Sequence, residues 1–83
     1  MSAGSDIETT DELLAEARGA ELQAAIHSRI ARIAEEGAEE TEDEQVRIGA
    51  LAWAQDVARS RRLAARASID LSRELYDRAA RAL

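Results

Sequence analysis

The chain has 83 residues, a formal net charge of −6, one histidine and no cysteine. Its length allows one domain at most, and its composition excludes disulfides and thiolate metal sites and leaves almost no ligands for zinc. Large apolar residues are few, and nineteen alanines supply much of the hydrophobic fraction. A domain with so little apolar bulk is marginal as a monomer, so we expect it to associate with itself or with a partner.

Residues 1–8 are small and polar and are expected to form a disordered tail ahead of a single domain over 9–83. Two copies of Thr-x-x-Glu begin at Thr9 and Thr41, and this pattern is the capping box of a helix N-terminus. Gly37 lies just before the second box, where a helix end favours a residue that tolerates the left-handed conformation. The predicted elements are a helix over about 10–36, a turn over 37–41 and a second helix over about 42–82.

The first predicted helix carries apolar residues on two nearly opposite faces. The isoleucine stripe, expected to pack in the core against the second helix, consists of Ala15, Gly19, Leu22, Ile26, Ile30 and Ile33. The alanine seam, spaced like a heptad, consists of Leu13, Ala17, Ala20, Ala24, His27, Ala31, Ala34 and Ala38. Because a hairpin gives this helix only one neighbour, the alanine seam is predicted to meet a second subunit. Alternatively, alanine simply fills these positions as the best helix former.

The second predicted helix has one broad apolar arc. Its main stripe is Val46, Ala50, Trp53, Val57, Ala64, Leu71, Leu75 and Ala79. Its flanking stripe is Leu51, Ala54, Ala58, Ala65, Ile69, Tyr76 and Leu83. Val46, Trp53 and Val57 are expected to complete the core. Arg61 interrupts the arc, with a stem that can pack and a guanidinium that can reach an edge or an acidic neighbour.

The two predicted helices differ in length, about 40 Å against about 60 Å at 1.5 Å per residue. A hairpin would therefore leave the last turns of the second helix without a neighbour, although they carry apolar side chains. Either the helix stays straight and a second subunit covers this overhang, or the chain bends near Ala67–Asp70 and a third helix folds back. No proline or glycine marks such a bend, so the straight helix is favoured.

The predicted fold class is all-α: an antiparallel helical hairpin with a longer second helix, dimerising into a four-helix bundle. The alternative is a three-helix bundle. The predicted partner interface combines the overhang, the alanine seam and an aromatic anchor of the kind that dominates hot spots. Its residues are Ala20, Ala24, His27, Ala31, Trp53, Leu71, Leu75, Tyr76 and Leu83.

Charge is distributed unevenly along the chain. Residues 1–56 carry fourteen acidic and four basic side chains, net −10, whereas residues 57–83 carry seven arginines and three acids, net +4. Such a basic stripe can neutralise phosphates, and it consists of Arg59, Arg62, Arg66 and Arg73. Charge matching between antiparallel helices and a solvated face are the simpler explanations, because no DNA-binding motif accompanies the stripe.

No arrangement of residues indicates catalysis. His27 has alanines at helical spacing and no orienting partner, and the chain lacks a glycine-rich phosphate loop and a Gly-x-Ser-x-Gly sequence. The acidic segment over 35–44 fits no EF-hand calcium loop. We therefore expect neither enzyme activity nor a bound cofactor, metal or small-molecule substrate.

The expected function is that of a small non-enzymatic protein acting through protein–protein association, as an assembly factor, adaptor or accessory subunit. Its expected partner is a second copy or a larger protein complex. One alternative is a nucleic-acid-binding or antitoxin-like regulator that uses the arginine stripe, and another is a phage structural or accessory component stable only in a larger complex. No stretch approaches the roughly 18 apolar residues of a membrane span, and the first residues lack a secretory pattern, so a cytoplasmic location without membrane contact is expected.

Overall fold

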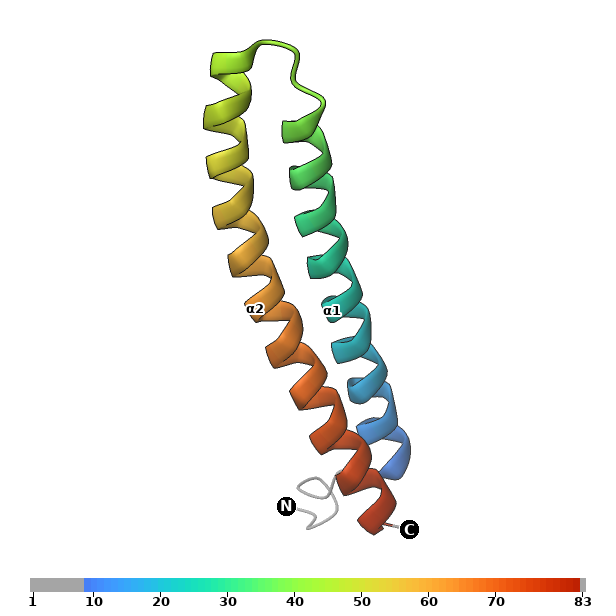
Figure 1. The fold of residues 1–83 in the computed structure, drawn as a ribbon. Coiled ribbons are helices and arrows are strands. Elements are labelled where there is room, and N and C mark those ends of the chain that lie inside the picture. The colour runs from blue at the N-terminus through green and yellow to red at the C-terminus, as the bar shows by residue number, and fades with distance from the viewer. Residues whose placement is uncertain (1–8, 83) are drawn as a thin grey trace, which may run out of the picture.

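The computed structural model describes residues 9–82, which form two helices packed antiparallel as a hairpin (Figure 1). Helix α1 spans Thr10–Glu39 and helix α2 spans Glu44–Ala82. The predicted all-α hairpin with a longer second helix is confirmed, and α2 runs unbroken past residue 70, so the three-helix alternative is wrong. The expected disordered tail over 1–8, and Leu83, lie outside the described residues.

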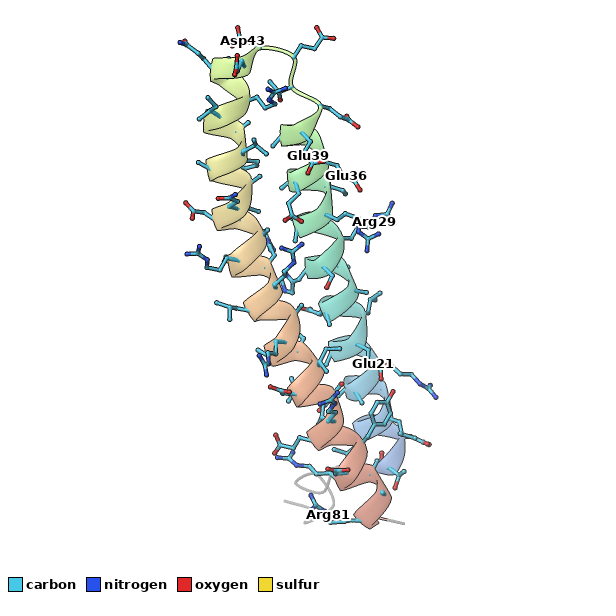
Figure 2. All side chains as sticks on the ribbon, in the orientation of Figure 1. Glu21, Arg29, Glu36, Glu39, Asp43 and Arg81 are labelled. Carbon is cyan, nitrogen blue, oxygen red and sulfur yellow. The ribbon has the colours of Figure 1, made fainter. Side chains whose placement is uncertain are left out.

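Each helix begins at a side-chain cap. Thr9 Oγ1 accepts a hydrogen bond from the Glu12 backbone N–H at 3.1 Å, so the first predicted capping threonine is confirmed. At the start of α2 the cap is Asp43 (Figure 2), whose Oδ1 accepts from two backbone N–H groups of the first turn at 3.0 and 3.1 Å. The predicted role of Thr41 as the second cap is therefore wrong, because α2 begins two residues later than the capping box implies.

The end of α1 also differs from the prediction. The helix continues past Gly37, and no residue over 9–82 has a positive φ, so Gly37 does not terminate it in a left-handed conformation. The Glu40 N–H bonds the Glu36 carbonyl at 3.0 Å, and the Thr41 hydroxyl donates to the Gly37 carbonyl at 3.1 Å. Thr41 thus satisfies a free carbonyl at the end of α1.

The contact between the two helices is a heptad seam in which twelve of the eighteen positions are alanine or serine. On α1 it is the alanine seam. The α2 seam row has the same alternating spacing of four and three, and consists of Arg47, Leu51, Ala54, Ala58, Arg61, Ala65, Ser68, Ser72, Leu75 and Ala79. Every member of both rows is buried or half-buried. Leu13 and Leu75 are the two leucines among the buried hydrophobic residues, and the others are alanines.

The predicted roles of the two apolar faces of α1 are therefore wrong. The alanine seam packs against α2 within one chain, whereas much of the isoleucine stripe is exposed. The predicted core residues Leu22, Ile26, Ile33, Val46 and Trp53 are all exposed, and Ile30 and Val57 are only half-buried. The alanine seam is the contact face because its heptad spacing is unbroken, which keeps the two helices in contact along their whole overlap.

Most of the overhang predicted for the C-terminal end of α2 is paired with the start of α1. Leu13 clusters with Leu75 and Ala79, so the start of α1 lies beside the last turns of α2. Leu75, predicted to project from an overhang, is consequently buried inside the hairpin. Figure 1 shows that α2 extends past the end of α1 at its own start, where Val46 and Ile48 are exposed.

Asp43→Ala is expected to lower the free energy of unfolding by about 1 kcal/mol, because it leaves two N–H groups of the first turn of α2 without their acceptor. Urea denaturation followed by circular dichroism measures this change. Glu42→Ala is the matched control, since it removes a neighbouring carboxylate and keeps the cap. Equal losses in the two variants would contradict the assignment of Asp43.

Candidate functional site

The two long sides of the hairpin, one on each side of the seam, carry different residues. Residues seven apart on a heptad helix form a straight row. The polar side is described by one row of each helix and the apolar side by two rows of each helix. The polar side contains Leu14, Glu21, Ser28 and Glu35 of α1 and Ile48, Gln55, Arg62, Ile69 and Tyr76 of α2. The apolar side contains Gly19, Gln23, Ile26, Ile30, Ile33 and Gly37 of α1 and Val46, Ala50, Trp53, Val57, Ser60, Ala64, Ala67 and Leu71 of α2, and its rows continue into the charged residues Glu16, Glu74 and Arg78.

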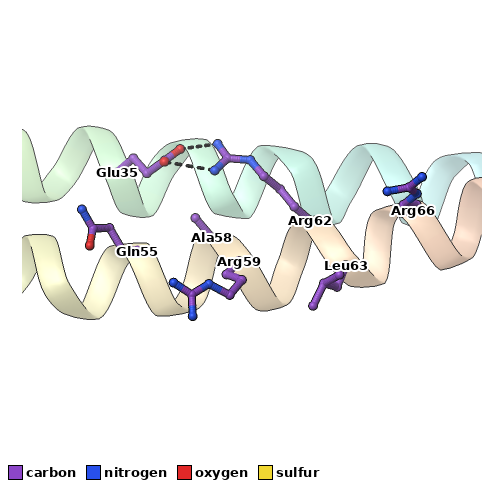
Figure 3. Close-up of a pocket in the computed structure, with 7 residues that line it drawn as sticks. All are labelled: Glu35, Gln55, Ala58, Arg59, Arg62, Leu63 and Arg66. Carbon is purple, nitrogen blue, oxygen red and sulfur yellow. Dashed lines mark hydrogen bonds and ion pairs between the residues drawn. The ribbon is translucent and has the colours of Figure 1, made fainter.

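The polar side is crossed by an ion pair between the helices. The Arg62 guanidinium donates two hydrogen bonds to the Glu35 carboxylate, and the one from Nη1 to Oε2 measures 3.1 Å (Figure 3). These hydrogen bonds hold the pKa of the Glu35 carboxyl below its ordinary value and raise the pKa of Arg62. The stabilisation is therefore present above the ordinary carboxyl pKa and is lost as the pH falls. It is small, because water screens an exposed pair.

Tyr76 closes the polar side near the open end of the hairpin. Its ring packs against the cluster that contains Leu13 and Leu75. Burial raises the pKa of the Tyr76 hydroxyl, and the neighbouring Glu21 carboxylate raises it further, while Arg18 acts in the opposite direction. Two contacts between the helices therefore occupy the polar side, one made by Arg62 and the other by Tyr76.

An open groove of about 530 Å³ brings together three members of the predicted arginine stripe, Arg59, Arg62 and Arg66 (Figure 3). Arg73 is not among its lining residues. The Glu35 carboxylate also lines the groove and is bonded to Arg62. A phosphate in this groove would therefore compete with a carboxylate already in place.

The apolar side gathers five of the nine exposed large hydrophobic residues: Ile26, Ile33, Val46, Trp53 and Leu71. Trp53 is 61% exposed and Ile33 is 56% exposed. Gly19 and Gln23 of α1 line one groove of about 430 Å³ together with Leu71 of α2, so the rows of the two helices face the same side. Large apolar side chains exposed together on one side of a protein mark a candidate interaction site.

The structure divides the residues of the predicted partner interface between different surroundings. Ala20, Ala24 and Ala31 are buried in the seam, not on a free face. His27 also lies in the seam, where its Nδ1 accepts a hydrogen bond from Arg61 Nη1 at 3.1 Å, because arginine can only donate.

Trp53 and Leu71 lie exposed on the apolar side, whereas Tyr76 is half-buried on the polar side. Five further residues of the apolar side are predicted from the sequence to lie in the core: Ile26, Ile30, Ile33, Val46 and Val57. The signal that identifies them is the position of their rows next to the unbroken seam.

Over residues 9–82, no group of three or more histidine, aspartate or glutamate side chains is placed to hold a metal ion. Neither described helix is both long and apolar enough to cross a membrane. No protein-family model, curated protein or solved structure matches the chain. Its function must therefore be inferred from its own surface.

Tyr76 is expected to titrate with a midpoint above about 10, the ordinary value for tyrosine, because the folded chain favours the neutral hydroxyl. Ultraviolet absorbance measures this ionisation directly, since Tyr76 is the only tyrosine. Because the folded pKa is raised, the associated stability is present below the ordinary pKa and is lost as the pH rises through the folded value. Glu21→Gln should move the midpoint back towards that of the urea-denatured chain, and identical midpoints in the folded and denatured wild-type chain would refute the shift.

Proposed function

We propose that this chain is a non-enzymatic helical protein that acts by association, presenting its apolar side to another helical protein surface as an assembly factor, adaptor or accessory subunit. One observation carries the proposal: the hairpin closes on alanines and leaves most of its large apolar side chains outside. Trp53 is the natural anchor of this surface, because tryptophan is enriched among the residues that dominate interface energies.

The hairpin buries few large apolar side chains and exposes many. Full burial of a leucine, isoleucine or valine side chain contributes about 1.5–3 kcal/mol. In this chain Leu13 and Leu75 receive that burial, whereas Ile26, Ile33 and Leu71 remain at least about half exposed. A partner that covers the apolar side would bury these side chains and stabilise the hairpin at the same time.

The arginine groove supports nucleic-acid binding less well. Arg62 is bonded to Glu35 inside the groove, and the chain as a whole carries a net charge of −6. A surface that binds phosphates by releasing their counterions needs a concentration of basic residues that are free to contact the backbone. The apolar side therefore supports protein association better than the groove supports this alternative.

A photoreactive benzoylphenylalanine in place of Trp53 is expected to form covalent adducts with a protein partner in cells that express the chain, because Trp53 is the largest exposed side chain of the apolar side. Leu63 is the matched control, since it is 65% exposed, close to the 61% of Trp53, but lies on the outer face of α2. Electrophoresis and mass spectrometry detect the adducts. Adducts at neither position, or equally at both, would contradict the proposal.

A further inference from the structure

We draw no further inference here: the strongest candidate, the exposed apolar side of the hairpin beside the helix seam, carries nothing beyond the proposed function, because nothing in the structure shows what covers it.

Discussion

Contact between α1 and α2 through alanine is the constraint on which the rest of the structure depends. The heptad spacing runs unbroken through eight positions of α1, and small side chains allow the two backbones to lie close together. Burial of an alanine methyl group contributes far less than the roughly 1.5–3 kcal/mol of a buried leucine or isoleucine. The hairpin therefore has a well-defined shape but gains little apolar free energy from it, and its larger side chains are left outside.

The position of the seam also decides the chemistry of the two long sides. On the polar side, Arg62 and Tyr76 of α2 reach acidic residues of α1, so that side is occupied by contacts within the chain. On the apolar side the adjoining rows carry isoleucine, valine, leucine and tryptophan, for which α1 and α2 supply no further neighbour. The two long sides of the hairpin thus differ, and the apolar side is the one suited to a partner.

The sequence predicts features that depend on local chemistry better than those that depend on the packing of distant residues. Thr9 caps α1 as predicted because its neighbours along the chain decide the cap. Thr41 and Asp43 both have capping side chains, and the path of the turn decides between them. The size of the isoleucine side chains favours their stripe as the core in a prediction from sequence. In the structure the alanine seam packs against α2 instead, because its heptad spacing is longer and unbroken. The burial of Leu75 depends on its distant contact with Leu13.

The hydrogen bond between Arg61 and His27 has a consequence for how α1 and α2 align. Both seam rows repeat every seven residues, so sliding one helix along the other by one repeat would still place one row against the other. After such a shift, however, the Arg61 guanidinium would face alanine methyl groups and lose His27 as its acceptor, which is unfavourable for a charged group. The Arg61–His27 hydrogen bond therefore favours the observed alignment of α1 and α2 over one shifted by a heptad.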